Sequence, residues 1–143
     1  MIKIRQKNTG KVLKAVDRKG TLYQVNLAGA RLMKANLYGE NLSRAKLARA
    51  NLNQADLRTT NFRGADLTGA HLKNAKCKGA NFTGADCAWV DFSGADLTDC
   101  KFQGADLTGA TFSGATLDNT DFTNAIRKWA HLDPRKEEHR CRK

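Results

Sequence analysis

The chain has 143 residues and carries 25 Lys and Arg against 14 Asp and Glu, so its formal net charge is +11. Its length is that of one domain, and 41% hydrophobic residues suffice for a packed core. It contains no apolar run of transmembrane length, no signal peptide and no lipidation motif, so we expect a cytoplasmic protein without a membrane span.

Residues 1–19 are predicted to form a hairpin. Ile2 and Ile4 alternate with basic residues, and a second apolar pair follows a turn that ends at Gly10. Stacked architectures leave their first layer open, so we expect this hairpin to be an N-terminal cap.

A five-residue period runs in one phase over residues 20–124, which gives 21 repeats without an insertion. Each repeat has a small residue, then often Asn or Asp, then an apolar centre, then two polar or small residues, as in A-D-L-T-G at 65–69. All 21 centres are apolar, which predicts that they point inward. The centres are Leu22, Leu27, Leu32, Leu37, Leu42, Leu47, Leu52, Leu57, Phe62, Leu67, Leu72, Cys77, Phe82, Cys87, Phe92, Leu97, Phe102, Leu107, Phe112, Leu117 and Phe122.

Neither a helix nor a strand has a period of five, but four sides of five residues close a square coil of 20 residues. About five such coils are expected, and centres 20 apart then stack, which places Phe62, Phe82, Phe102 and Phe122 in one column. The second residue after the centre is Gly in ten repeats, as a type II turn favours. The remaining repeats carry other residues there, which predicts some irregular turns. Along one side, four residues replace the small inward Ala: Glu40, which we expect to turn outward or find a partner, and Thr60, Cys100 and Thr120.

This A(D/N)LxG tandem resembles the pentapeptide repeat family. The resemblance implies an all-β fold, a right-handed quadrilateral β-helix with a solid core, over residues 20–124. It implies little about function, because the family uses one scaffold in many roles.

The repeat pattern ends where Arg127 occupies a centre position. Apolar residues then fall at helical spacing around Trp129, which predicts a short helix over 125–131 that covers the last coil. Asp133 followed by proline predicts a second, polar helical turn. Residues 125–143 are therefore expected to be a helical cap and a basic tail.

The charge is unevenly distributed. Residues 1–60 carry 13 basic and 3 acidic side chains, residues 61–124 carry 5 and 8, and residues 125–143 carry 7 and 3. A solvated surface is one interpretation, and attraction to an anionic partner is the other. The candidate partner-binding cations are Arg44, Lys46 and Arg49 in the basic half and Lys73, Lys76 and Lys78 around one later coil.

No pattern of catalytic or metal-binding residues stands out. The three histidines are far apart in the repeat, and the cysteine spacing fits no zinc site. Surface structure explains the seven Asp residues in the second repeat position, which are Asp56, Asp66, Asp86, Asp91, Asp96, Asp106 and Asp121. Of these, Asp66, Asp86 and Asp106 form a carboxylate stripe on one side. We therefore expect no enzyme activity, no cofactor and no metal.

The cysteines are predicted to be reduced. Cys77 and Cys87 occupy centres and Cys100 an inward small position, where each acts as a small buried hydrophobe. Cys141 lies in the basic tail and is expected to be a bystander thiol.

Trp89 is the best candidate for an interface anchor, together with Ala88 and Val90, because it stands where this turn usually has Gly. The alternative is that Trp89 lies along the rod over the Gly109 turn toward Trp129.

Three functions remain open at the level of sequence. The first is a non-enzymatic protein-interaction or scaffold module, a monomer or weak dimer, that presents flat faces to a macromolecular partner. The second follows from a resemblance in repeat pattern to the quinolone-resistance pentapeptide proteins, which bind DNA gyrase as DNA mimics; the basic half of this chain opposes it. The third is a basic module that binds nucleic acid or another anionic surface, although few exposed aromatic residues support it.

Overall fold

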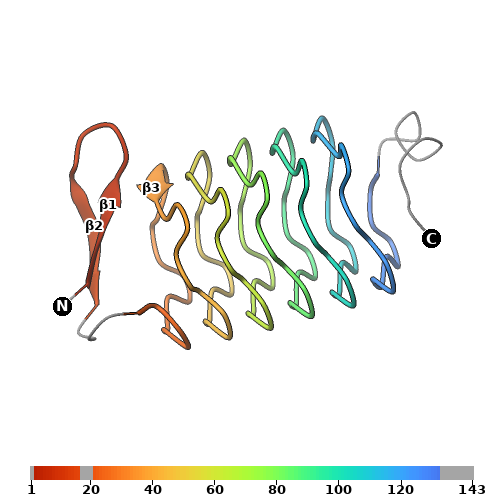
Figure 1. Ribbon diagram of the computed structural model, residues 1–143, viewed down its shortest axis with the longest axis horizontal. Coiled ribbons are helices and arrows are strands. Elements are labelled where there is room, and N and C mark those ends of the chain that lie inside the picture. Colours follow the sequence, from red (N-terminus) through yellow and green to blue (C-terminus); the bar gives the residue numbers. More distant parts are fainter. Residues whose placement is uncertain (1, 17–20, 133–143) are drawn as a thin grey trace.

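The structure is a computed structural model that describes residues 2–16 and 21–132. It is a rod, with a β-hairpin at one end and square coils following one another along the axis (Figure 1). The hairpin consists of β1 (Ile2–Gln6) and β2 (Val12–Val16), and the strand β3 (Ala35–Asn36) belongs to the first coil.

Parallel bridges join residues 20 positions apart, so four five-residue sides close each coil, as predicted. One series runs along the rod from Asn26 to Ile126. Each link uses two backbone hydrogen bonds. The Leu27 N–H donates to the Lys46 carbonyl (2.7 Å), and the Lys46 N–H donates to the Val25 carbonyl (2.8 Å). The backbone polar groups of each coil are thus satisfied by its neighbours.

A hydrogen-bonded turn follows every centre from Leu22 to Arg127, in which the N–H three residues on donates to the carbonyl of the centre. The second residue after the centre has a positive φ throughout, 64–73° at the ten glycines and 55–60° at twelve other residues. The expectation of irregular turns at the non-glycine repeats is therefore wrong. Neighbouring coils are hydrogen-bonded on both sides of these turns, and this bonding outweighs the left-handed cost of about 1–2 kcal/mol per residue.

The predicted phenylalanine column is confirmed, and it fills the coil interior. Successive ring centroids along it are 4.7–5.4 Å apart with their planes within 12° of parallel. A second column meets it edge-on at 5.5–6.3 Å. Such stacked and perpendicular contacts are the favoured aromatic geometries. The first column is Phe62, Phe82, Phe102 and Phe122, and the second is Phe92 and Phe112.

Polar residues at the inward small position are satisfied by the backbone. The side chains of Thr60, Cys100 and Thr120 each donate to the carbonyl 23 residues earlier, at 2.7–2.9 Å. Glu40 at the same position is exposed, as predicted. A hydroxyl or thiol therefore fits inside this coil, whereas a carboxylate turns outward because its burial is costly.

The predicted helix over 125–131 is wrong, because the coil continues there. The N–H groups of Ile126 and His131 donate to carbonyls 21 residues earlier (2.9 and 2.8 Å), and Trp129 has a φ of 59° like every other corner. The apolar residues that suggested a helix occupy different positions of the five-residue period: Ile126 is an outward residue, Trp129 a corner residue and Ala130 an inward one. Arg127 is exposed, and its guanidinium lies 6.0 Å from the ring centroid of Phe122. The second predicted turn, at Asp133, lies outside the described residues.

The hairpin attaches to the rod through its first strand. β1 pairs antiparallel with β2 on one edge, with an irregularity after Ile4, and with β3 on the other. Ile4 is 2% exposed and belongs to the core. The hairpin thus covers part of the open end of the coil and satisfies the backbone of β3.

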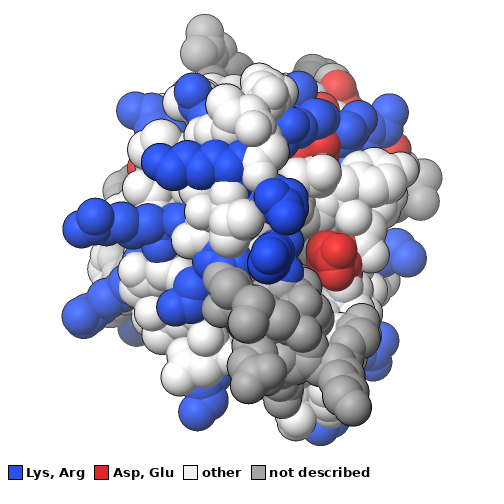
Figure 2. Space-filling view, turned by 90° about the vertical axis from the view of Figure 1, so that its left-hand side faces the viewer, with Lys and Arg blue, Asp and Glu red and all other residues white. Residues whose placement is uncertain are grey.

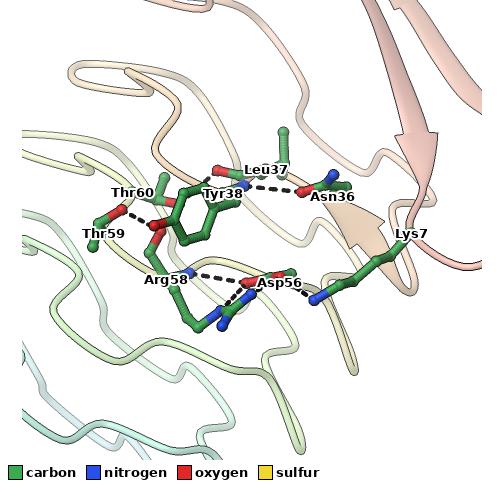
Figure 3. A network of polar contacts seen from close by, with 8 residues as sticks. All are labelled: Lys7, Asn36, Leu37, Tyr38, Asp56, Arg58, Thr59 and Thr60. Atoms are coloured by element: carbon green, nitrogen blue, oxygen red, sulfur yellow. Dashed lines mark hydrogen bonds and ion pairs between the residues drawn. The ribbon is translucent and has the colours of Figure 1, made fainter.

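A buried carboxylate links the hairpin to the coil (Figure 3). Asp56 is 2% exposed; Arg58 donates to both of its oxygens (2.8 and 2.7 Å) and the Lys7 ammonium to one (2.5 Å). Arg58 also lies over the Tyr38 ring, 5.1 Å from its centroid. The hydrogen bonds from Arg58, joined by the one from Lys7, hold the pKa of Asp56 well below its usual range, although burial opposes the shift. Assigning Asp56 to surface structure was therefore wrong.

The Asp56 pairing predicts a specific dependence of stability on pH. A carboxyl whose pKa is lowered in the folded chain contributes stability that is fully present above the pKa of the unfolded group, near 3.8, and is lost as the pH falls below it. We expect Asp56→Asn to lower the melting temperature at pH 7 and to approach the wild type in acid.

Thermal unfolding between pH 2 and 7 measures this, with Asp86→Asn as the control, because Asp86 has the same repeat position but is exposed. If the melting temperatures of wild type and Asp56→Asn changed in parallel with pH, the claim that the ionised Asp56 pair stabilises the fold would be contradicted.

Candidate functional site

The coil presents four sides, each carrying the outward residues that precede the centres, and the turn residues form the corners between them. We number the sides in chain order, so the first begins at Asn26, the second at Arg31, the third at Asn36 and the fourth at Asn41. The first and third sides lie opposite each other across the rod, and they hold the candidate residues.

Three cations span the first side within one coil, and we call them the basic belt. Lys46 is the outward residue of the side, and Arg44 and Arg49 occupy its two corners. A Cβ placed on Gly64 or Gly69 would lie 3.6 Å from the Cγ of these arginines, so both side chains lie along the rod over the next coil. Within the described part of the chain, none of the three forms an ion pair.

The acidic stripe of Asp66, Asp86 and Asp106 follows the belt on the same side, joined by parallel bridges as predicted. One oxygen of each carboxylate accepts the backbone N–H two residues later, at 2.9–3.2 Å. These bonds orient the carboxylates and leave the second oxygen of each for other interactions.

The aromatic end, formed by Trp89, Ile126 and Trp129, completes the first side; these side chains are 59%, 55% and 63% exposed. The indole rings are 6.5 Å apart between centroids, and Trp89 covers Gly109. The interpretation that Trp89 lies along the rod toward Trp129 is confirmed. Val90, in contrast, is 1% exposed and points inward, so including it in a surface patch was wrong.

The other predicted cations lie on the third side. Lys76 is its outward residue, bridged between Asp56 and Asp96, and Lys73 and Lys78 occupy its corners. Lys76 therefore has a carboxylate residue beside it in each neighbouring coil, Asp56 in one and Asp96 in the other. The two groups of predicted cations are therefore on opposite sides, and no single surface brings them together.

The excess of basic residues in the N-terminal part of the chain is visible on the end of the molecule that carries the hairpin. Lys and Arg predominate over Asp and Glu on the end face that carries the hairpin (Figure 2). The basic belt lies only one coil from that end, so it adds to the positive charge there.

Sequence reasoning missed the part played by Asp56. Arg58, two residues later, was a usable signal, because turn geometry brings these side chains together. No local signal could have indicated Lys7, which lies 49 residues away in the hairpin.

The three inward cysteines are buried free thiols, as predicted. Burial raises the pKa of Cys77, Cys87 and Cys100, so all three remain protonated and unreactive at neutral pH. Cys141 lies outside the described residues.

The described residues also bear on metals and membranes. Over 2–16 and 21–132, no group of three or more His, Cys, Asp and Glu is placed to hold a metal ion. The same ranges contain no helix that is long and apolar enough to cross a membrane.

The fold is that of a repeat solenoid, a four-sided β-helix. The family model for pentapeptide repeats matches the sequence of this chain in eight copies, so the chain belongs to the pentapeptide repeat family. The matched segments are 26–64, 41–76, 60–99, 91–126 and 100–133.

Solved structures of other family members are similar to this chain. HetL from the cyanobacterium Nostoc sp. PCC 7120, involved in heterocyst differentiation regulation, is 36% identical over 80% of this chain, with a TM-score of 0.45; the chain spans 58% of HetL. A protein of the Arabidopsis thaliana thylakoid lumen is 30% identical over 77% of this chain and 73% of its own, with a TM-score of 0.41.

The protein alr5209, also from Nostoc, gives a TM-score of 0.58 at 25% identity, covering 83% of this chain and 86% of its own. Membership of this family, together with the fold match to alr5209, implies a right-handed β-helix. A comparison with curated proteins found no match.

The contact between Trp89 and Gly109 predicts a difference between two glycine substitutions. Gly104 and Gly109 are both left-handed corners (φ 64° and 67°), so alanine is strained at either, by about 1–2 kcal/mol. A Cβ on Gly104 would meet nothing within 4 Å, whereas one on Gly109 would overlap the Trp89 ring. We expect Gly109→Ala to lower the free energy of unfolding by about 1–3 kcal/mol more than Gly104→Ala, as overpacking does.

Chemical denaturation measures the free energy of unfolding lost in each glycine variant. We expect the two losses to become equal when each substitution is combined with Trp89→Ala. If Gly104→Ala and Gly109→Ala cost the same free energy of unfolding in the chain that keeps Trp89, the indole does not cover Gly109.

Proposed function

We propose that this chain is a non-enzymatic interaction module that binds a protein partner through the first side of its β-helix. The observation that carries the proposal is the order of chemistry along that side: the basic belt, then the acidic stripe, then the aromatic end. A protein surface can offer acidic, basic and apolar groups in the complementary order, and a homogeneous polyanion cannot.

The scaffold favours binding of this kind. Every coil is hydrogen-bonded to its neighbours and the interior is filled by stacked side chains. Binding to such a preorganised surface orders little of the module itself, which leaves more of the contact energy for affinity. Trp89 and Trp129 supply large exposed anchors of the type that dominates protein interfaces.

The same side argues against the two alternatives. A nucleic acid running along the rod would meet the carboxylates of Asp66, Asp86 and Asp106 directly after the basic belt. A DNA mimic needs a continuous negative surface, and the belt of Arg44, Lys46 and Arg49 interrupts it. We therefore place the nucleic-acid module and the gyrase regulator below a protein-binding module.

Two triple variants test the proposal. Reversing Arg44, Lys46 and Arg49 to Glu alters the first side, and reversing Lys73, Lys76 and Lys78 to Glu makes the same change of charge on the third. Proteins captured by the immobilised chain in an extract of its source cells are compared by mass spectrometry. We expect the first variant, and Trp89→Ala, to lose at least one specific partner that the third-side variant retains.

If both triple variants lost the same partners, capture would depend on the net charge of the chain and not on the first side, which would contradict the proposal. Stoichiometric inhibition of DNA gyrase supercoiling by the purified chain would instead favour the gyrase alternative.

A further inference from the structure

A groove lies at the corner between the fourth and first sides, beside the basic belt. Its volume is about 440 Å³, within the range of sites that hold small ligands or single side chains. Its walls are formed by Tyr23, Ser43, Arg44, Asn61, Arg63 and Thr83.

The groove exists because two successive corners lack side chains. Gly64 and Gly84 stand in the corner column directly after Arg44. The side chain of Arg44 lies over Gly64, and a Cβ on Gly84 would meet nothing within 4 Å. The hollow is therefore open over the backbone of Gly84, and both Arg44 and Arg63 belong to its lining.

The lining is rich in hydrogen-bond donors and carries no carboxylate. Within the described residues neither Arg44 nor Arg63 forms an ion pair. The carbonyl of the Asn61 side chain accepts the Arg63 N–H (3.0 Å), so its amide group remains available to donate. The complement of such a lining is an anionic group with several acceptor oxygens.

We propose that this groove binds carboxylates of a short acidic segment in the protein partner, which pair with Arg44 and Arg63 of its lining. The proposal rests on the proposed function for the nature of the partner. Guanidinium groups pair with carboxylates through two parallel hydrogen bonds, which gives orientation as well as attraction. A short segment fits better than an extended polyphosphate, because the acidic stripe begins at Asp66, directly beyond Gly64.

The test uses a fluorescein-labelled hexaglutamate peptide, with hexaglutamine as the neutral control. Binding is measured by fluorescence anisotropy for wild type, Arg63→Gln and Arg31→Gln. The two substitutions each remove one charge from an exposed arginine, but Arg31 lies on the second side. We expect Arg63→Gln to weaken hexaglutamate binding about five- to tenfold, as loss of a charge-assisted pair does, and Arg31→Gln to weaken it less than twofold.

NMR spectra of the ¹⁵N-labelled chain locate the peptide. We expect shifts at the amides of Gly64 and Gly84 and none at Gly104 or Gly114. Equal weakening by the two arginine variants, shifts spread over the basic end, or no binding of hexaglutamate at millimolar concentration would each overturn the proposal. Binding of inorganic phosphate in the groove without binding of hexaglutamate would overturn it in favour of a phosphate site.

Arg63 is outside the basic belt, so the two proposals can fail separately. If belt reversal, which includes Arg44→Glu, leaves partner capture intact while hexaglutamate binding to the wild type still depends on Arg63, the proposed function fails and the groove stands only as a carboxylate site. If belt reversal abolishes capture while Arg63→Gln changes neither capture nor hexaglutamate binding, the groove fails and the proposed function stands.

Discussion

A left-handed residue at every fifth position is the constraint on which the rest of this molecule depends. This residue closes each turn, so that four sides complete a coil in 20 residues and each centre stacks on the centre 20 residues away in the neighbouring coil. Among the residues that the structure describes, twelve of these corners are not glycine, and each carries the strain of a left-handed side chain. The continuous backbone ladder and the buried columns must together exceed that strain, so local conformation and long-range stacking stabilise each other.

The same corners also pattern the surface. Where a larger corner residue is followed 20 positions later by glycine, its side chain lies down over that glycine, as Arg44, Arg49, Thr59, Asn74 and Trp89 all do. Glycine in the repeat is therefore more than a turn residue, because it makes room for the side chain of the preceding coil. The basic belt, the aromatic end and the corner groove are three results of this arrangement.

The sequence predicted the features that a regular residue pattern controls and little else. The inward centres, the phenylalanine column and the N-terminal hairpin follow from patterns that have one physical explanation. The coil beyond Asn124 was missed because Arg127 breaks the pattern of centres, while the backbone ladder and the alanines at 125 and 130 still support another turn. The Asp56 pairing was missed because it depends on where the hairpin lies, and no repeat pattern encodes a contact between residues 7 and 56. The period gives the place of each candidate cation in its repeat, but their separation onto opposite sides of the rod follows only from the positions of the four sides.

Chemical denaturation of Phe82→Ala tests most directly whether the stacked columns hold the coil together. The Phe82 ring lies between those of Phe62 and Phe102, 4.9 and 4.7 Å away between centroids, and its side chain is fully buried. The account predicts that Phe82→Ala lowers the free energy of unfolding by about 3–5 kcal/mol. It predicts that Phe82→Leu, which keeps most of the volume, costs less than about 1.5 kcal/mol. A loss under about 1 kcal/mol for Phe82→Ala would contradict the account, because a truncation of that size in a packed column cannot be neutral.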